Sequence, residues 1–261
     1  MSSDDPFLTK KQYKHIDQTI QRIIARDGVD RKTLDEVFDL STLLSIEKLI
    51  SHKIIDYIDF PISSGKEGNV FLAHTPEKKI VAVKIYRIST ATFKHMTKYI
   101  QGDPRFQSLH KSRRDIIYAW TSKEFKNLQI LEDIKVRAPR PIKKINNVVV
   151  MEFIGTGKQP APLLKNSIIK DPEKTYITIL KAIKKMYQKG HLVHCDLSPF
   201  NILYHKQKPY IIDLGQAVLF YHPDAKDFLK RDIDNICTFF KKYQITCDPK
   251  EIFETLTKQK W

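Results

Sequence analysis

Polar side chains of the types that phosphoryl transfer uses lie close together in the last third of the sequence. The stretch HCDLSPFN, residues 194–201, places Asp196 and Asn201 on a predicted loop between a helix and a strand, and Asp213 follows at the end of a later predicted strand. In phosphoryl transfer one carboxylate orients the attacking hydroxyl or water, while an amide oxygen and a second carboxylate hold Mg²⁺ against the phosphates. The order and spacing of these residues therefore indicate a phosphoryl-transfer site.

Two charged residues earlier in the chain fit the same chemistry. Lys84 ends the predicted strand VAVK, the setting in which a lysine bridges the α- and β-phosphates of a nucleotide. Glu124 lies on a predicted helix over residues 115–134, from which it could pair with Lys84. Each residue alone is weak evidence, because such side chains are usually solvated. Their order along the chain, ahead of Asp196, makes the combination specific.

A glycine-containing segment, SSGKEGNV at residues 63–70, lies between the first two predicted strands. Its glycines allow backbone N–H groups to approach phosphate oxygens. The segment is not a Walker A loop, because Glu67 follows Lys66 and no glycine stands five residues before Gly65. On its own it would be an ordinary hairpin turn, but beside the residues above it is a candidate phosphate-binding loop.

The composition is that of a globular, soluble chain. Of 261 residues, 41% are hydrophobic and 10% aromatic, which is enough for a packed core. No run approaches the roughly 18 apolar residues of a membrane-spanning helix, and the first residues, MSSDDP, lack the features of a secretory signal. The three cysteines show no CxxC spacing, so neither a disulfide framework nor a Cys-based zinc site is expected. We therefore expect a cytoplasmic protein.

The net charge of +15 is concentrated in residues 78–114, which hold ten Lys and Arg residues against one acid, Asp103. Within this stretch, residues 86–112 show weak periodicity and predict a long basic loop. The loop either forms a solvated surface or faces RNA or the nucleotide. Its aromatic residues either stack on bases or pin the loop to the domain: Phe93, Tyr99 and Phe106.

Hydrophobic periodicity predicts helices at both ends of the chain, and the first three expected strands form an antiparallel meander. The expected strands are residues 57–62, 70–74, 80–85, 141–145, 148–153, 202–204 and 210–213. The expected helices cover the first fifty or so residues, with Ser41 as an N-cap, then residues 115–134, residues 176–187 with Gly190 as the C-cap glycine, and a region from about Pro223.

The chain resembles the RIO family of atypical protein kinases. The motifs GKEGNV (residues 65–70), HCDLSPFN (194–201) and IIDLGQ (211–216) carry this resemblance, which covers roughly residues 43–243. Residues 93–106 and 160–165 resemble the first, type-one subfamily, and no winged-helix pattern of the second subfamily precedes them. From the absence of long tails we expect an archaeal-like member of this subfamily.

The resemblance implies a two-lobed, protein-kinase-like α+β fold. Its N-lobe would be a five-stranded antiparallel sheet with one helix, and its C-lobe would be mostly helical and truncated. The implied domains are an N-terminal helical extension over residues 1–50, an N-lobe over 51–154 that includes the basic loop, and a C-lobe over 155–261. ATP and Mg²⁺, with Mn²⁺ as a substitute, would bind in the cleft.

The resemblance also implies roles for individual residues. Asp196 would be the catalytic base, Asn201 and Asp213 the metal ligands, and Asp213 also a candidate covalent phosphoryl acceptor. Lys84 would contact phosphates and Glu124 would pair with it, while residues 151–154 would offer backbone groups to adenine. The implied nucleotide contacts are Ser64, Gly65, Lys66, Glu67, Gly68, Asn69, Val70, Lys84, Glu124, Met151, Glu152, Ile154 and Pro160.

The departures from ordinary protein kinases predict a different mode of control. Cys195, rather than arginine, precedes Asp196, so sensing of a phosphorylated activation loop by that arginine is not expected. We interpret Cys195 as a packing residue rather than a redox switch. No Ala-Pro-Glu motif follows Asp213, and the remaining chain is too short for both an activation segment and a peptide-docking platform.

Three functions are compatible with these residues. The expected one is a serine/threonine kinase that also phosphorylates itself and acts in maturation of the small ribosomal subunit, as the resemblance implies. A second is an ATPase-driven assembly factor that binds pre-ribosomal RNA or protein and hydrolyses ATP through an aspartyl-phosphate. A small-molecule phosphotransferase is the third, but the basic charge and short C-lobe disfavour a pocket for a cationic substrate.

Overall fold

The computed structural model describes residues 37–65, 68–88, 96, 99–100, 103, 105 and 112–258. The chain divides into two compact units. Unit 1 contains residues 1–93, 111–121 and 141–153, and unit 2 contains residues 94–110, 122–140 and 154–261. Residues 94–110 and 122–140, which the sequence analysis included in the N-lobe, thus group with unit 2.

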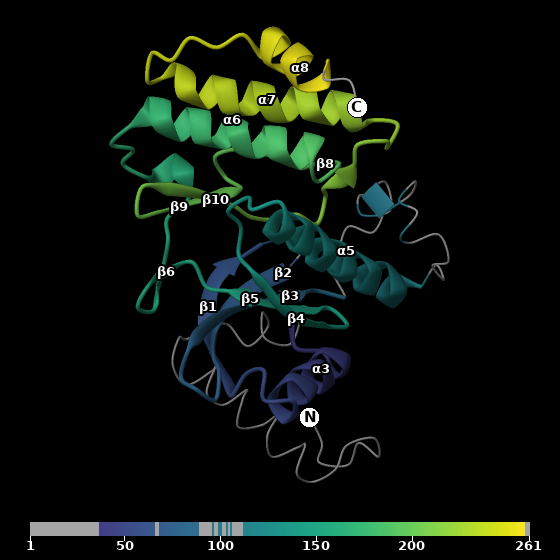
Figure 1. Cartoon of the computed structure of the whole chain (residues 1–261). Helices are drawn as coiled ribbons and strands as arrows, with labels where there is room; N and C mark the ends of the chain where they lie inside the picture. Colours follow the sequence, from purple (N-terminus) through teal and green to yellow (C-terminus); the bar gives the residue numbers. More distant parts are fainter. Residues whose placement is uncertain are drawn as a thin grey trace. The chain divides into compact units, whose positions relative to one another are not determined.

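Unit 1 is built on a five-stranded antiparallel sheet, as the sequence predicts (Figure 1). Its strands pair in the order β1-β2-β3-β5-β4. They are β1 (Tyr57–Ser64), β2 (Gly68–His74), β3 (Ile80–Tyr86), β4 (Pro141–Ile145) and β5 (Val148–Glu152). The register places Lys84 of β3 between Val70 of β2 and Val149 of β5. Lys84 is therefore held on a central strand, where pairing on both sides fixes its backbone.

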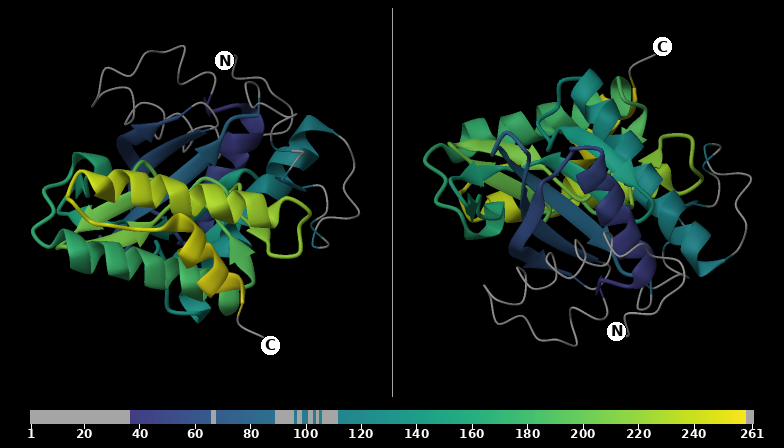
Figure 2. Two further views of the ribbon diagram at one scale, coloured as in Figure 1. Left: turned by 90° about the horizontal axis from the view of Figure 1, so that it is seen from above. Right: turned by 90° about the horizontal axis from the view of Figure 1, so that it is seen from below.

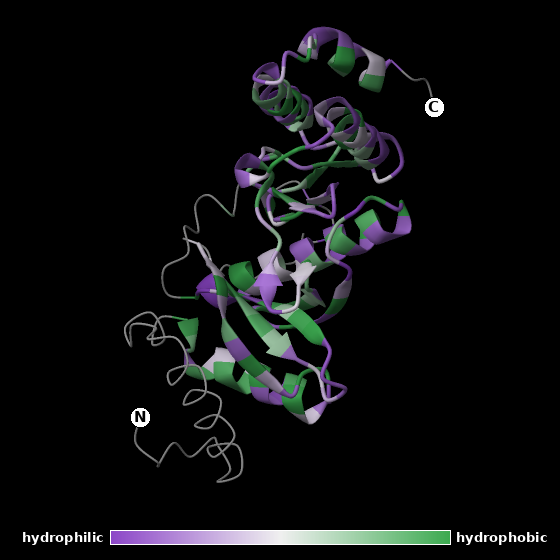
Figure 3. Ribbon diagram, turned by 90° about the vertical axis from the view of Figure 1, so that its left-hand side faces the viewer, coloured by the Kyte–Doolittle hydropathy of each residue, from purple (hydrophilic) through white to green (hydrophobic). Residues whose placement is uncertain are grey.

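Helix α3 (Leu40–Ser51) packs its apolar face against this sheet, with Leu43, Ile46 and Leu49 in one buried core with the strands. Figure 3 shows the hydrophobic residues of the strands in green. The predicted N-cap, Ser41, is wrong. Asp39 caps the helix instead, because its carboxylate accepts a hydrogen bond from the N–H of Thr42 at 2.8 Å.

Helix α5 (Arg113–Asp133) belongs to both units, since its residues from Ser122 onward group with unit 2. Its bounds agree closely with the predicted helix over residues 115–134. Most of its side chains are buried or half-buried, and among the fully buried ones are Trp120 and Lys123. A helix buried on several sides offers polar groups to the interior from more than one face.

Unit 2 is mostly helical, as predicted. Its helices are α6 (Pro172–Gln188), α7 (Ala225–Lys241) and α8 (Pro249–Thr257), with a short 3₁₀ helix η2 (Leu164–Asn166). Figures 1 and 2 show α6 and α7 running side by side. Three two-stranded ladders complete the unit: β6 (Gly155–Thr156) with β7 (Gln159–Pro160), β8 (Leu192–Val193) with β11 (Val218–Leu219), and β9 (Ile202–His205) with β10 (Lys208–Ile211).

The end of α6 depends on a glycine for a different reason than the sequence predicts. Gly190 directly follows the C-cap residue Lys189, which is the place of a C-cap glycine, but it does not have the positive φ that such a glycine usually supplies. A Cβ at Gly190 would lie 3.0 Å from side-chain atoms of Ile130 and Ile134. Gly190 therefore permits close packing against α5.

Across the described residues, no helix has both the length and the apolar character that a membrane crossing requires.

Candidate active site

The candidate catalytic loop, residues 194–201, leaves β8 and enters β9 in unit 2. Asp196 and Asn201 are half-buried on it, between the fully buried Cys195, Leu197 and Ile202. This alternation anchors the loop by its apolar side chains and leaves the polar ones within reach of solvent. Such a carboxylate can meet a substrate without losing its fixed position.

Asn201 folds back onto Asp196. Its side-chain Nδ2 donates to the backbone oxygen of Asp196 at 2.8 Å and to the carboxylate Oδ2 at 2.9 Å. The two residues that the sequence places five positions apart are therefore in contact, so the amide of Asn201 fixes the orientation of the Asp196 carboxylate. Because Nδ2 faces Asp196, the amide oxygen of Asn201 is oriented away from that carboxylate and is the atom suited to a metal ion.

Asp213 is brought to the same place by the residue before it. The backbone of Ile212 donates its N–H to the carbonyl of Asn201 at 3.0 Å and accepts a contact from Nε2 of His194 at 3.0 Å. His194 is fully buried, and burial lowers its pKa, so the neutral imidazole is favoured. The strand carrying Asp213 ends earlier than predicted, since β10 stops at Ile211.

Two non-glycine residues of this region have left-handed backbone conformations. Cys195 has φ 71° and Asp213 has φ 62°. Such conformations cost energy and persist where the surrounding structure imposes them. They turn the chain sharply beside the two candidate carboxylates. Burial also raises the pKa of the Cys195 thiol, which supports its interpretation as a packing residue.

Asp232 of α7 stabilises the candidate catalytic loop by binding its backbone, and the sequence analysis did not identify this residue. Its carboxylate accepts hydrogen bonds from the backbone N–H groups of Cys195 at 2.9 Å and Leu197 at 2.8 Å. Asn235, one turn later, donates to the carbonyl of Leu197 at 3.1 Å, and Arg231 donates to the carbonyl of Cys195. One face of α7 thus fixes the backbone on both sides of Asp196.

A signal for Asp232 exists in the sequence. It lies within the apolar stripe that α7 buries, which includes Phe228, Leu229, Ile233 and Ile236. A carboxylate on such a stripe needs buried donors. Burial raises the pKa of Asp232 to about 7, although the two N–H donors act in the opposite direction.

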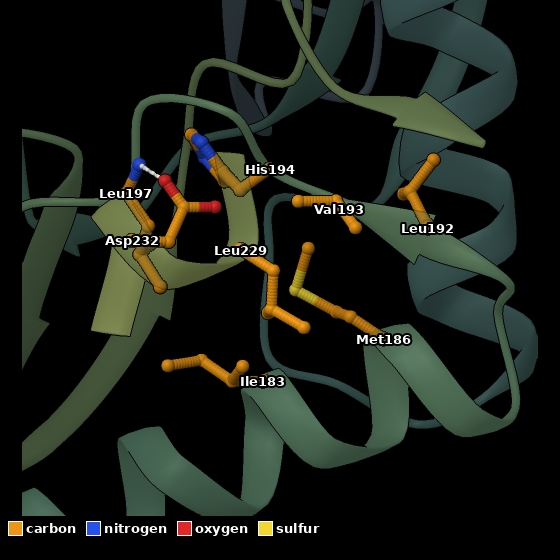
Figure 4. A pocket seen from close by; sticks show the side chains of 8 residues that line it. All are labelled: Ile183, Met186, Leu192, Val193, His194, Leu197, Leu229 and Asp232. Carbon is orange, nitrogen blue, oxygen red and sulfur yellow. Dashed lines mark hydrogen bonds between the residues drawn. The ribbon is translucent and has the colours of Figure 1, made fainter. Parts of the chain in front are cut away.

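A small cavity lies behind the loop. Its volume is about 10 Å³, room for about one water molecule and far too little for a nucleotide. Figure 4 shows the Asp232 carboxylate reaching the N–H of Leu197 at its edge. Among the described residues, Nδ1 of His194 is buried there without a hydrogen-bond partner. The remaining lining is aliphatic: Ile183, Met186, Leu192, Val193, Leu197 and Leu229.

The glycine-containing segment lies in unit 1, at the turn between β1 and β2. Ser64 ends β1, while Asn69 and Val70 lie on β2. A Cβ at Gly68 would lie 2.4 Å from the carbonyl oxygen of Ile85, so this glycine is required for the close approach of β2 and β3. Lys66 and Glu67 lie outside the described residues.

Asn69 is occupied by contacts of its own. Its Oδ1 accepts from Nε and Nη2 of Arg87 at 3.1 and 2.8 Å, and its Nδ2 donates to Ser64 at 3.3 Å. These bonds brace the β1–β2 turn, so the side chain of Asn69 is a structural element of the predicted phosphate-binding segment. Its predicted contact with the nucleotide stays a prediction.

The remaining predicted nucleotide residues are distributed over both units. Lys84, Met151 and Glu152 lie in unit 1, whereas Glu124, Ile154 and Pro160 lie in unit 2. Glu124 is buried at 2% exposure, and the pairing with Lys84 stays a prediction. The carbonyl of Ile154 already accepts the N–H of Ala161 at 2.9 Å, so its N–H is the group suited to adenine.

The candidate metal ligands are few. Within the part of the chain that the structure describes, no three His, Cys, Asp or Glu side chains form a cluster suited to a metal ion. Mg²⁺, however, is commonly bound by one or two protein oxygens together with substrate phosphates and water. The amide of Asn201 and the carboxylate of Asp213 fit that donor set.

Two described residues of the basic loop make contacts within unit 2, and the segment is not irregular throughout as predicted, because Met96, Tyr99 and Ile100 have helical backbone. Tyr99 is buried and lies against Phe228, with ring centroids 5.5 Å apart, so it pins the loop to unit 2. Arg105 donates to Asp103 and Asn127 inside the same unit. Phe93 and Phe106 lie outside the described residues.

Comparisons with known proteins identify the family. Residues 69–252 match the family described as RIO domain. The chain is 42% identical over 255 residues to the RIO-type serine/threonine-protein kinase Rio1 of Methanocaldococcus jannaschii, covering 96% of this chain and 87% of that protein. It is 38% identical to the human serine/threonine-protein kinase RIO1, covering 89% of this chain and 42% of the human protein.

Solved structures agree on the fold. The crystal structure of the Rio2 kinase–ADP/Mg²⁺–phosphoaspartate complex from Chaetomium thermophilum matches 97% of this chain and 88% of its own with a TM-score of 0.65, at 19% identity. This likeness confirms the expected two-lobed, kinase-like α+β fold. Together with the domain match and the Rio1 relatives, it leads to one conclusion: the chain belongs to the RIO family, among the Rio1-type serine/threonine-protein kinases.

Proposed function

We propose that the chain binds ATP with Mg²⁺ and transfers the γ-phosphoryl group to serine or threonine hydroxyls, its own included. The contact between Asn201 and Asp196 carries this proposal, because it places a carboxylate and an amide oxygen on one fixed loop. Asp196 would accept the hydrogen bond of the attacking hydroxyl and orient its oxygen toward the γ-phosphorus.

The other residues would position the nucleotide. Asn201 and Asp213 would hold Mg²⁺, whose charge stabilises the phosphates during transfer. Lys84 would contact the α- and β-phosphates, and Glu124 would orient Lys84. Residues 151–154 would contribute the carbonyl of Glu152 and the N–H of Ile154 to adenine, in keeping with the occupied carbonyl of Ile154.

The test is turnover of γ-³²P-ATP by wild type, Asp196→Ala and Asp213→Asn, with free phosphate and protein-bound label measured separately. Asp227→Asn, which removes an exposed carboxylate of α7, is the matched control. The kinase proposal predicts acid-stable label on serine or threonine that disappears in Asp196→Ala and persists in the control. Absence of Mg²⁺-dependent label in wild type would overturn it.

The same experiment measures a second candidate, ATP hydrolysis through Asp213. The Rio2 complex from Chaetomium thermophilum contains a phosphoaspartate, which favours testing it. In this reaction a carboxylate oxygen of Asp213 would form a bond to the γ-phosphorus as the bond to the β-phosphate oxygen breaks and ADP leaves. Water would then release phosphate. Hydroxylamine-labile label that is lost in Asp213→Asn would support this reaction.

We also propose the precursor of the small ribosomal subunit as partner and the cytoplasm as location, with the net charge of +15 in support. Because Arg105 is bonded within unit 2, the variant to test is Lys94→Ala/Lys98→Ala. The Lys94→Ala/Lys98→Ala variant should bind structured ribosomal RNA more weakly and with a smaller salt dependence. The control Lys181→Ala/Lys184→Ala, which removes exposed charges from α6, should bind this RNA like wild type. Equal effects of both pairs would count against a specific role of the loop. Cell fractionation tests the proposed location.

A further inference from the structure

We propose that Lys123 and Asn127 of α5 are positioning residues for Asp213, and that Arg105 of the basic loop keeps Asn127 in its working orientation. The inference rests on the proposed role of Asp213 as a metal ligand. All of its residues belong to unit 2. It adds a link between the basic loop and the metal site that the sequence motifs do not contain.

Lys123 is the first part of this link. It is completely buried, and its Nζ donates to the carbonyls of Gly215 at 2.8 Å and Ala217 at 2.5 Å. A buried amine is costly unless its hydrogen bonds are made. The hydrogen bonds to Gly215 and Ala217, two residues that closely follow Asp213, therefore offset the cost of burying the Lys123 amine.

Asn127, one helical turn later, contacts the same segment. Its Nδ2 donates to the carbonyl of Leu214 at 2.9 Å and to that of Ala217 at 3.2 Å. Two side chains of α5 thus make four hydrogen bonds to the three carbonyls of Leu214, Gly215 and Ala217. Asp213 directly precedes this segment with φ 62°, a conformation that needs external support.

Arg105 determines which way the amide of Asn127 points. Its Nη1 donates to Oδ1 of Asn127 at 3.0 Å. A guanidinium only donates and a backbone carbonyl only accepts, so one amide orientation satisfies both neighbours. Arg105 is itself held by Asp103, through contacts of 2.6 to 3.1 Å. The amide oxygen of Asn127 thus faces Arg105 of the basic loop, and its amide nitrogen faces residues 214–217, which follow Asp213.

The role predicted for these residues is to fix the position of Asp213 in the metal-free protein. Groups that orient metal ligands typically change metal affinity by about 10- to 100-fold when removed. A residue that serves the fold alone would instead lower thermal stability and leave the affinity of the folded protein for metal unchanged. The two roles therefore give different results in a binding measurement.

The experiment measures Mn²⁺ binding, by electron paramagnetic resonance, to the full chain saturated with a non-hydrolysable ATP analogue. Asn127→Ala is expected to weaken Mn²⁺ binding by about 10-fold or more, and Arg105→Ala by a smaller factor. Amide hydrogen exchange at residues 214–217, measured without metal, should become faster in both variants. Lys123→Met should act like Asn127→Ala.

Two controls lie on the same helix. Gln129→Ala removes an exposed amide and should change nothing, while Leu128→Ala removes a buried side chain and should lower the melting temperature without weakening Mn²⁺ binding. Wild-type affinity in Asn127→Ala, or an equal loss in Leu128→Ala, would overturn the inference. If Asn127→Ala does not fold, Arg105→Ala decides, because it leaves both amide donors in place. Lack of Mn²⁺ binding by wild type would reject the proposed metal site itself, and the inference with it.

Discussion

The catalytic loop of unit 2 and the glycine-containing turn of unit 1 are held in different ways. The loop around Asp196 is fixed by side chains of a distant helix that bind its backbone, above all Asp232. The turn before Gly68 is fixed by strand pairing and by a close backbone approach to Ile85. The first arrangement determines the position of individual charges, and the second determines where backbone groups lie. These are the respective needs of a base with metal ligands and of a phosphate-binding segment.

The largest expected effect is the loss of Asp196. Asp196→Ala should lower kcat by about 10²- to 10⁴-fold, because the attacking hydroxyl loses its oriented acceptor. Since Asp196 is half-buried, the melting temperature should stay close to that of wild type. Steady-state kinetics with thermal melting measures both quantities, and a kcat within threefold of wild type would remove Asp196 from the chemistry.

The second-largest effect is expected when Asp232, which binds the backbone of the catalytic loop, is removed. Asp232→Ala leaves the buried N–H groups of Cys195 and Leu197 without their acceptor, at a cost of about 1–3 kcal/mol each. Urea unfolding should show this loss, together with a reduced kcat. Asp234→Ala, an exposed position on the same helix, is the control and should change neither quantity.

The turn of unit 1 offers a contrast between two glycines. Gly68→Ala should destabilise the protein by about 1–3 kcal/mol, because the added Cβ would overlap the backbone oxygen of Ile85. Gly65→Ala should have a much smaller effect, since its Cβ would lie 3.3 Å from the carbonyl oxygen of Gly68. Equal unfolding free energies for the two variants would show that strand approach does not hold this turn.

The smallest expected effect is a change in pH dependence. Burial lowers the pKa of Lys123 to about 7 from its ordinary 10.5, so between these values the unfolded chain binds more protons than the folded one. This group therefore makes stability rise with pH in that range, by about 1 kcal/mol between pH 7 and 8. Urea unfolding of wild type and Lys123→Met across this range should show a steeper rise for wild type. An equal pH dependence of the unfolding free energy in wild type and Lys123→Met would contradict a lowered pKa of Lys123.

Local patterns predicted most of the fold. The sheet of unit 1 follows from alternating apolar runs and their turns, and α5 and α6 follow from helical periodicity. The predicted cap of α3 was wrong because Asp39 and Ser41 are both good capping residues, and the sequence does not show which one meets the free N–H groups.

The site was predictable where its residues are close in sequence. The sequence placed Asp196 and Asn201 on one loop, and the structure shows that their side chains are in contact; their catalytic and metal-binding roles stay predictions. Asp232, Lys123 and Asn127 were not found, because they bind backbone groups that lie far away in the sequence. Backbone groups are the same at every residue, so no side-chain pattern marks the partner of such a contact.

The pairing of β8 with β11 has a consequence for folding. Val193, just before the catalytic loop, pairs with Val218, just after the segment that follows Asp213, so Asp196, Asn201 and Asp213 all lie on one short closed stretch of chain. Closing this stretch costs less conformational entropy than closing the much longer loops that the hydrogen bonds from α5 span. The β9–β10 hairpin inside this stretch can therefore form before the long-range hydrogen bonds from α5 and α7.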